Sequence, residues 1–345
     1  DFYGCPEYCI SPRLDGGWSQ PQEIPGLRTK KLSEQLSEGV ADLRLFKLPD
    51  SRKVLAIGCN TFYTDKGALA WEQKVNQKQK IKEPRQMAVY CVYDEDKGWS
   101  ERYDLEAECM RDCSNWRVAC AQLAFSEDGA ILLPVYFETG RIDFHGYASA
   151  RFSVCVMLAR WKNGRLKVEA CSNILSHQHL RGFVEPSLYR FQNEYFLTIR
   201  AEDGKAYWSR STDPLHFPEP QAWCFDDGQN LKTDSTQQHW LELDSRLYLV
   251  YTRDNGSNFM VPRFRAPLYM ARFDERAGVL EKDSELVVLP HETRNGLHGM
   301  LGNFHCLSLP DKRALVCDAA AFLRTAEDQV LERHCELWLA EIKAP

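Results

Sequence analysis

The sequence repeats one local unit, and this repeat constrains the fold more than any other feature. Each copy has a strand in which apolar and polar residues alternate, a short turn containing Asp, Gly or Asn, and a second β-rich strand. The copies cover residues 42–60, 118–138, 184–201, 236–254 and 301–318. A two-residue alternation bounded by turn residues predicts antiparallel strand pairs.

Each pair is followed by a further strand and an edge-like segment, so we expect five units of four strands. Small antiparallel sheets repeated in this way predict an all-β fold, a five-bladed β-propeller forming a single domain over residues 1–345. Six blades are the alternative if the long first unit hides another blade. A tandem of β-sandwiches explains the regular unit less well. Helical spacing is convincing only near residues 32–38 and 320–332, where short helices are expected.

The two ends of the chain indicate how the propeller closes. Residues 14–26 resemble the outermost strand of a blade without inner strands before it, and residues 335–343 supply strands without an outer one after them. We therefore expect an N-terminal strand to complete the last blade, because this pairing removes an exposed sheet edge. Full closure of this kind also predicts a monomer.

Composition excludes several classes of protein. Hydrophobic residues make up 44% and charged residues 27% of the chain, which is typical of a globular protein. The longest apolar run, near residues 130–137, is far shorter than the roughly 20 residues that span a bilayer. The net charge is −6, and the most basic stretch, residues 74–85, is interrupted by Gln and Glu. A nucleic-acid partner is therefore not expected.

The 13 cysteines are odd in number and lack the regular spacing of a zinc site. Cys5 with Cys9, and Cys109 with Cys113, either close short loops or stay unpaired. Three others lie in strand-like runs where a reduced thiol packs as a small apolar residue, Cys91, Cys155 and Cys317. We expect most thiols to be free and buried.

The cell compartment stays open at this stage. The chain begins at Asp1 rather than Met. A periplasmic or secreted location follows if a signal peptide preceded Asp1, and a cytoplasmic one if all cysteines are free.

Several segments resemble the sialidase (neuraminidase) superfamily. The turns at residues 15–18, 94–99 and 211–217 resemble degenerate Asp boxes, the S-x-D-x-G-x-x-W hairpins of that family. Residues 185–200 resemble the segment in which a Glu opens an inner strand and an Arg ends the next strand. Residues 251–271 resemble the blade with a further substrate-binding arginine, and Arg265 takes the matching place. Residues 130–137 resemble the third pair of inner strands.

The chain also departs from this family at two catalytic positions. Residues 39–45 lack the Arg-Ile-Pro motif, and Arg44 lies inside the strand. Phe304 or an adjacent residue stands where the family has a nucleophilic Tyr, and Phe cannot act as a nucleophile. The resemblance therefore implies a sialidase-like propeller whose chemistry differs from that of a true sialidase.

In a propeller, residues near the starts of the inner strands surround one pocket. Glu185 is expected there as a general acid/base or the partner of a nucleophile, with a purely structural ion pair to Arg200 as the alternative. Arg200 and Arg265 offer planar bidentate donors for a sugar carboxylate or sulfate, and Arg181 adds a third. These arginines imply an acidic substrate.

Histidines near the blade entries are candidates for proton transfer or substrate binding. His179 is the catalytic candidate, while His298 and His305 are expected to bind substrate. His177 and His179 share the spacing of metal ligands, but no third ligand is evident, so neither a metal nor a cofactor is predicted.

Asp65 is the candidate for a second catalytic carboxylate. If it faces the pocket with Glu185, the separation of the two would distinguish retaining from inverting hydrolysis. Asp203 and Asn303 are expected to hydrogen-bond sugar hydroxyls. Aromatic side chains that could stack on sugar rings are Tyr136, Trp208 and Tyr251.

The leading hypothesis is an exo-acting glycoside hydrolase that releases a sugar from an acidic or otherwise decorated glycan. Two alternatives remain. One is a polysaccharide lyase in which a His or Tyr abstracts a proton from a uronic acid. The other is a carbohydrate-binding propeller without catalysis, because a fold does not confer activity by itself.

Overall fold

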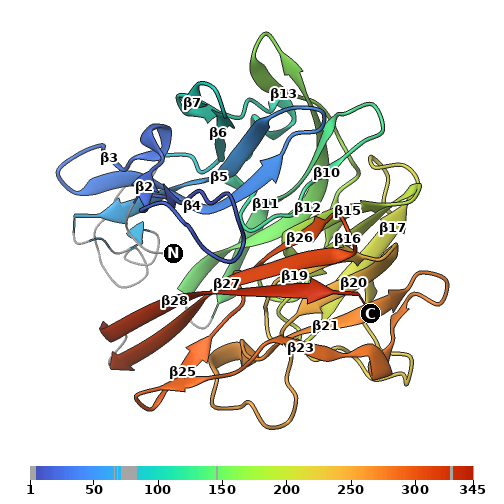
Figure 1. Ribbon diagram of the computed structural model, residues 1–345. Helices are drawn as coiled ribbons and strands as arrows, with labels where there is room; N and C mark the ends of the chain where they lie inside the picture. Colours follow the sequence, from blue (N-terminus) through green and yellow to red (C-terminus); the bar gives the residue numbers. More distant parts are fainter. Residues whose placement is uncertain are drawn as a thin grey trace.

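The computed structural model describes residues 5–65, 67, 69–70, 84–144, 147–326 and 329–344. It is an all-β protein in which antiparallel sheets follow one another around a central axis, in the order of the chain (Figure 1). The expectation of a five-bladed β-propeller is confirmed, and the alternatives of six blades or a sandwich tandem are not met.

Each of the first two blades has its longest strands at the centre of the sheet. Blade 1 contains β3 (Lys30–Lys31), β4 (Leu36–Lys47), β5 (Lys53–Thr64), β6 (Ala88–Asp94), β7 (Gly98–Trp99) and β8 (Tyr103–Asp104). Blade 2 contains β9 (Trp116–Arg117), β10 (Ala124–Phe125), β11 (Ile131–Phe144), β12 (Tyr147–Lys162), β13 (Arg165–Cys171) and β14 (Leu175–Ser176).

The remaining three blades follow the same antiparallel plan. Blade 3 contains β15 (Val184–Phe191), β16 (Glu194–Arg200), β17 (Ala206–Ser211) and β18 (Gln221–Ala222). Blade 4 contains β19 (Gln238–Leu243), β20 (Arg246–Tyr251), β21 (Leu268–Asp274), β22 (Val279–Leu280) and β23 (Leu286–Leu289). Blade 5 contains β24 (Thr293–Arg294), β25 (Leu297–Met300), β26 (His305–Leu309), β27 (Arg313–Ala326) and β28 (Gln329–Lys343).

Apolar clusters between neighbouring blades hold the sheets together. Separate clusters join blade 1 to 2, 2 to 3, 3 to 4 and 4 to 5. Between blades 3 and 4, the indoles of Trp208 and Trp223 stack with centroids 5.3 Å apart, and the ring of Phe273 meets both edge-on. Aromatic side chains of this size carry much of the apolar area that such a fold buries. Trp208 and Tyr251 therefore belong to the core rather than to a sugar-binding surface.

The prediction that an N-terminal strand completes the last blade is wrong for the described residues. β1 (Glu7–Tyr8) and β2 (Gln22–Glu23) pair only with each other. Ile24 and Leu27 then pack against the face of blade 1, where each is at most 1% exposed. The ring of Tyr8 also meets the indole of Trp99, with centroids 5.4 Å apart. Burial of these apolar groups on blade 1 outweighs the pairing of a sheet edge on blade 5.

The helices expected near residues 32–38 and 320–332 are not formed. β4 begins within the first segment, and residues 320–326 continue β27. In both places a long antiparallel register overrides the local spacing, which covers too few residues to sustain a helix. No described helix is long and apolar enough to cross a membrane.

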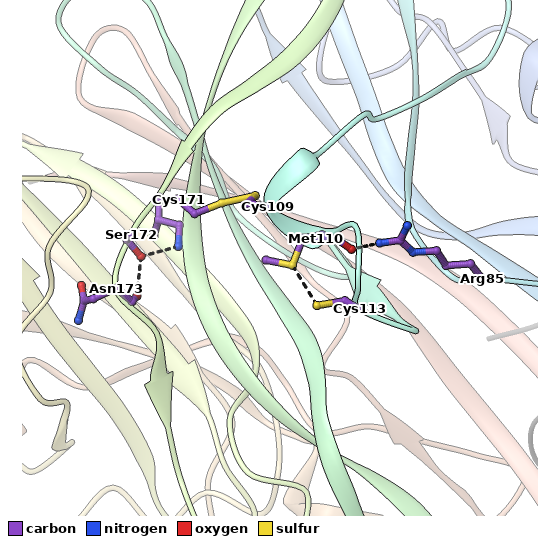
Figure 2. The surroundings of a disulfide bond; sticks show 8 residues. Arg85, Cys109, Met110, Cys113, Cys171, Ser172 and Asn173 are labelled. Carbon is purple, nitrogen blue, oxygen red and sulfur yellow. Dashed lines mark hydrogen bonds between the residues drawn. A yellow bond between two sulfur atoms is a disulfide. The ribbon is translucent and has the colours of Figure 1, made fainter.

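One disulfide links two segments of the chain that lie 62 residues apart. Cys109, in the 3-10 helix η2 (Glu108–Met110), is bonded to Cys171 at the end of β13 (Figure 2). Cys113 instead lies beside Met110, with 3.6 Å between the two sulfur atoms. The short loops considered for the cysteines are not closed, and 11 described cysteines are free. Most thiols are unpaired, as expected, but among the free ones only Cys59, Cys91, Cys120 and Cys155 are buried.

Candidate functional site

Five residues in left-handed backbone conformations, one from each blade, lie where the inner strands begin or bulge. We call them the axial ring: Asp42 (φ 55°), Cys120 (φ 57°), Glu185 (φ 46°), Ser235 (φ 51°) and Gly302 (φ 117°). Residues other than glycine rarely adopt such angles, and those that do are held there by their surroundings, often at functional sites. The repetition around the axis marks this end of the propeller as the candidate site.

A hydrogen-bonded layer fills the axis next to the ring. Arg44 of blade 1 is 4% exposed, and its Nη1 donates to the carbonyl oxygen of Phe304 in blade 5 over 2.6 Å. Its Nη2 donates to Oε1 of Gln237 in blade 4 over 3.0 Å. The same Oε1 atom lies 3.2 Å from Nε2 of His239, whose Nδ1 lies 2.7 Å from Oγ of Ser187 in blade 3.

Blade 2 joins this layer through Gln122. Its side-chain Nε2 donates to the carbonyl oxygen of Trp240, and its Oε1 accepts from the backbone N–H of Trp240, both over 2.9 Å. The layer therefore contains groups from all five blades. Buried polar groups that satisfy one another are rigid, so the axis is closed on this side of the ring.

Glu185 and Arg200 form the central ion pair of the site. The distance between Oε1 of Glu185 and Nη1 of Arg200 is 2.5 Å, and their side chains are 15% and 6% exposed. Burial by itself would raise the pKa of Glu185, but the charge and hydrogen bond of Arg200 outweigh it and lower that pKa. Glu185 is therefore a carboxylate at neutral pH, and its buried Oε2 has no hydrogen-bond partner among the described atoms.

A second, outer pair continues from Arg200. Nε of Arg200 donates to Oγ of Ser235 over 3.0 Å, and this hydroxyl donates to Oε1 of Glu202 over 3.2 Å. Glu202 also accepts from Nε of Arg181 over 2.7 Å. Arg181 is thus paired in the same way as Arg200, although its side chain is 26% exposed.

Arg263 and Arg265 differ from these two arginines. They lie in and after the 3-10 helix η3 (Pro262–Phe264), and no described carboxylate is within ion-pair distance of either. Nε of Arg265 is buried without a hydrogen-bond partner. Burial and the positive charge of Arg200 lower the pKa of Arg265, and burial with the charges of Arg200 and Arg265 lowers the pKa of Arg263 to about 10.

The glycine of the axial ring lies against Arg265. A Cβ atom built on Gly302 would lie 3.5 Å from Cδ of Arg265 and 3.6 Å from its Nε, which are ordinary van der Waals distances. The stem of Arg265 therefore lines the space beside position 302. Asp318, whose Oδ2 accepts from the Gly302 N–H over 2.6 Å, is the nearby carboxyl on β27, and burial raises its pKa to about 6.

The opposite side of the ring carries Asp42 and Cys120. The thiol of Cys120 lies in the electrostatic fields of the Asp42 and Glu185 carboxylates. Burial raises the pKa of the Cys120 thiol, and both carboxylates raise it further. Tyr136, which is 5% exposed, lies in the same field, beside Arg117.

Among the predicted site residues, the structure brings Glu185, Arg200, Arg265 and Arg181 together. Asn303 adjoins them at the exposed edge of the ring, where its Oδ1 accepts from Nε2 of Gln237 over 3.0 Å. The remaining predicted residues lie elsewhere, and each has a local explanation.

Asp65 is exposed in the turn after β5, and His179 is exposed in the loop before blade 3. His298 on β25 faces His291, with 3.0 Å between Nδ1 and Nε2. Asp203 accepts from the Tyr207 hydroxyl over 2.6 Å.

His305 is half-buried on β26. Burial, followed by the nearby charge of Arg44, lowers the pKa of its imidazole well below the usual value. It is therefore neutral at pH 7 and offers no charge to an anion. The described residues contain no group of three or more His, Cys, Asp or Glu side chains that could hold a metal ion.

The sequence-based reasoning missed Asp42, Cys120 and Arg263. A signal for the first two exists: in A-D-L-R-L, A-C-A-Q-L and V-E-P-S-L the ring residue precedes a leucine by three positions. Aligning the blade entries on Glu185 would have selected Asp42 and Cys120. Arg263 has no such signal, because its place depends on the course of a loop.

No family model and no curated protein match the sequence. Solved structures do match. A Trypanosoma rangeli sialidase aligns over 95% of this chain and 48% of its own, with a TM-score of 0.56 and 12% identity. A mutant of the NanB sialidase from Streptococcus pneumoniae aligns over 97% of this chain and 63% of its own, with a TM-score of 0.59 and 9% identity.

A mutant of Bacillus subtilis levansucrase aligns over 89% of this chain and 85% of its own, with a TM-score of 0.51 and 10% identity. The chain spans about half the length of the T. rangeli sialidase and 63% of the NanB structure. At these identities the likeness concerns the fold. The chain shares the β-propeller fold of these structures.

Proposed function

We propose that this protein is an exo-acting glycoside hydrolase that releases a terminal acidic sugar. The observation that carries the proposal is the pairing of two catalytic carboxylate candidates, Asp42 and Glu185, with two arginines that have no acidic partner among the described residues. The site thus has both the groups for glycosidic bond cleavage and the charge for an anionic substrate.

The charge argument rests on Arg263 and Arg265. Burying a guanidinium without a counter-charge is unfavourable, and the lowered pKa of each reflects this cost. A carboxylate or sulfate bound between them would relieve it and accept the planar bidentate hydrogen bonds that arginine donates. An acidic sugar is the class of substrate that supplies such a group.

The catalytic argument rests on the different surroundings of the two carboxyl groups. Arg200 holds Glu185 ionised, which suits a nucleophile or a general base. Asp42 has no ion pair with a described Arg or Lys within bonding distance, so we assign it the role of delivering the proton to the leaving group. Paired carboxyl groups in unlike environments are the usual basis of glycoside hydrolysis.

The filled axis supports the exo mode. Arg44 and Gln237 close the channel on one side of the ring, so a chain could not thread through it. This closure favours binding of a glycan by its end, and we assign the exo mode on that basis. The names of the matching structures, two sialidases and a levansucrase, are consistent with a carbohydrate-acting propeller.

The test is a panel of 4-methylumbelliferyl glycosides of N-acetylneuraminic, glucuronic and neutral sugars, with uronic acid polysaccharides added. Reducing ends and ultraviolet absorbance are followed together. The parent should release an acidic sugar, and Glu185→Gln should lower kcat by about a hundredfold or more. Glu285→Gln, which breaks the similarly short Arg253–Glu285 pair in blade 4, is the matched control and should keep the parent rate.

Two outcomes would overturn the proposal. Ultraviolet absorbance without release of a saturated sugar would indicate a lyase, with proton abstraction in place of hydrolysis. Binding of acidic sugars with no product in either channel would indicate a carbohydrate-binding propeller. An equal loss of kcat in Glu185→Gln and Glu285→Gln would show that the loss comes from a disturbed fold rather than from a missing catalytic group.

A further inference from the structure

We propose that the outer edge of β28 pairs with β28 of a second copy of this chain, so that two propellers form a dimer whose twofold axis passes through Leu337. The inference concerns the surface of blade 5 and does not depend on the proposed function. It starts from the edge that an N-terminal strand was expected to cover.

β28 is a long strand that is paired along one side. It runs over 15 residues and pairs with β27 from Lys343 opposite Arg313 to Gln329 opposite Ala326. No strand among the described residues pairs with its other side (Figure 1). The backbone N–H and C=O groups of such an edge form a template on which a further strand can add.

The outer edges of the other blades are protected by short strands or by charge. Blades 1, 3 and 4 end in β7, β8, β18, β22 and β23, which have two to four residues each. In β13 of blade 2, the side chains of Arg165, Lys167 and Glu169 are exposed. Both devices are common protections against pairing of sheet edges. β28 is longer than all of these strands, so its middle depends on charge for such protection.

The middle of β28 carries an uncharged row on its exposed face. One face of the strand packs against the apolar cluster between blades 4 and 5 through Trp338, Ala340 and Ile342. On the other face, Leu337 is 79% and Leu339 is 44% exposed, and Cys335 beside them is also exposed. A neighbouring strand would bring side chains to within about 5 Å of this row and remove apolar surface from water.

The row is complementary to itself in an antiparallel pair. A twofold axis at Leu337 sets Leu337 of one copy opposite Leu337 of the other, and Cys335 opposite Leu339. Registers centred on Trp338 or Leu339 would instead set Cys335 or Leu337 opposite Glu341. The first register keeps apolar residues together, as an isologous interface requires. A second copy of the chain therefore supplies the complement that this edge needs.

The first test is sedimentation equilibrium of the parent and two variants over a wide range of concentration. The parent should dimerise, and Leu337→Lys should raise the dissociation constant by about tenfold or more, since it sets two like charges opposite each other at the axis. Ile174→Lys is the matched control, because Ile174 is 58% exposed outside the strands of blade 2, and it should leave the constant unchanged. A parent that stays monomeric at every concentration would overturn the inference, as would an equal effect of the two variants.

A second test checks the register by oxidation. Leu337→Cys is made in a background with Cys9→Ser and Cys335→Ser, which removes the two exposed thiols. Opposite residues of an antiparallel pair have Cα atoms about 4.5 to 5.5 Å apart, which a disulfide can span. Mild oxidation should therefore link Leu337→Cys into a covalent dimer. Leu339→Cys in the same background should stay unlinked, and a link through Leu339→Cys alone would overturn the register.

A third test separates pairing of the strand edges from contact between the blade faces. The backbone amide hydrogens of residues 334–343 should exchange with solvent more slowly in the parent dimer than in Leu337→Lys, because pairing uses amide groups of the outer edge. Equal exchange in the two would overturn edge pairing even if a dimer forms. Far-ultraviolet circular dichroism shows whether Leu337→Lys is folded. None of these measurements uses a substrate, so they are independent of the glycoside panel.

Discussion

The four arginines of the candidate site divide into two sets that differ in their partners. Arg200 and Arg181 pair with Glu185 and Glu202, and Ser235 links the two pairs. Arg263 and Arg265, on the loop between β20 and β21, have no such partner among the described carboxylates. The first set holds blade 3 in shape.

The second set carries unbalanced charge, so arginine content alone does not identify a substrate site. What identifies it is the absence of a counter-ion where burial makes that absence costly.

Removing Arg200 should produce the largest loss of stability. Arg200→Met leaves Glu185 buried without its counter-ion, and breaking a buried pair costs about 3 to 5 kcal/mol. Urea unfolding at pH 7, followed by tryptophan fluorescence, measures the change. Arg272→Met, which removes a more exposed pair with Glu281, should cost about 1 kcal/mol or less. Equal costs for the two variants would contradict the claim that burial makes the Arg200–Glu185 pair the more important one for stability.

Removing Arg265 should weaken the binding of an anion without lowering the stability of the protein. Arg265→Met should weaken binding of N-acetylneuraminate, glucuronate or inorganic sulfate by about thirtyfold or more, since losing one partner of a desolvated charge pair costs about 2 kcal/mol. The free energy of unfolding without ligand should stay the same or rise, because an uncompensated charge is removed. Isothermal titration calorimetry and urea unfolding test the two statements. Arg160→Met, in a surface pair of blade 2, should change neither.

The balance of charge around Arg265 should also depend on pH through Asp318. Burial raises the pKa of Asp318 from the usual 3.8 to about 6, so this group is largely neutral at pH 5 and ionised at pH 7. Ionised Asp318 lies beyond ion-pair distance of Arg265 and offsets only part of its charge, so the affinity for an acidic sugar should fall several-fold between pH 5 and pH 7. Asp318→Asn should flatten this dependence in the same titration.

The stability of the protein should also depend on pH through Asp318, and the raised pKa of this group fixes the direction of the change. A carboxyl group whose pKa is higher in the folded state stabilises the protein below pH 4 and loses that contribution as the pH rises through about 6. The unfolding free energy of the parent minus that of Asp318→Asn is measured by urea unfolding across this pH range. This difference should fall by roughly 1 to 3 kcal/mol as the pH rises. A rising difference would contradict the assignment.

The smallest effect is expected at Arg181. Its side chain is 26% exposed, so Arg181→Gln should cost about 1 kcal/mol of stability or less. The affinity for an acidic sugar should change no more than about twofold, because Arg181 is already paired with Glu202. A loss as large as that of Arg265→Met would place Arg181 among the binding arginines, as the sequence-based expectation had it.

Much of the fold could be predicted from local patterns, because the strands of each blade follow one another closely in the sequence. The alternation in residues 184–201 and 236–254 predicts the β15–β16 and β19–β20 hairpins that the structure contains. The course of the N-terminal segment was predicted less well. Whether residues 14–26 cover blade 1 or extend blade 5 depends on which surface buries more apolar area, and no sequence period encodes that choice.

For the site, the pattern E-P-S-L and the arginine before A-P-L led to Glu185 and Arg265. Asp65 is the candidate from the sequence because it follows the first inner hairpin, whereas Asp42 lies inside a strand. The bulge between Ala41 and Arg44 turns Asp42 into the ring, and a bulge is invisible in a simple alternation.

The sequence by itself determined the number of blades and the residue types that meet at their inner strands, because strand alternation and turn residues act within a few positions of one another. The tertiary structure decided which charges are compensated. Glu185 and Arg200 are 15 positions apart, and Arg263 and Arg265 reach the same site from another blade. Coulomb energy and desolvation depend on distance in space and on burial, so only the closed ring of blades could show where an anion is missing.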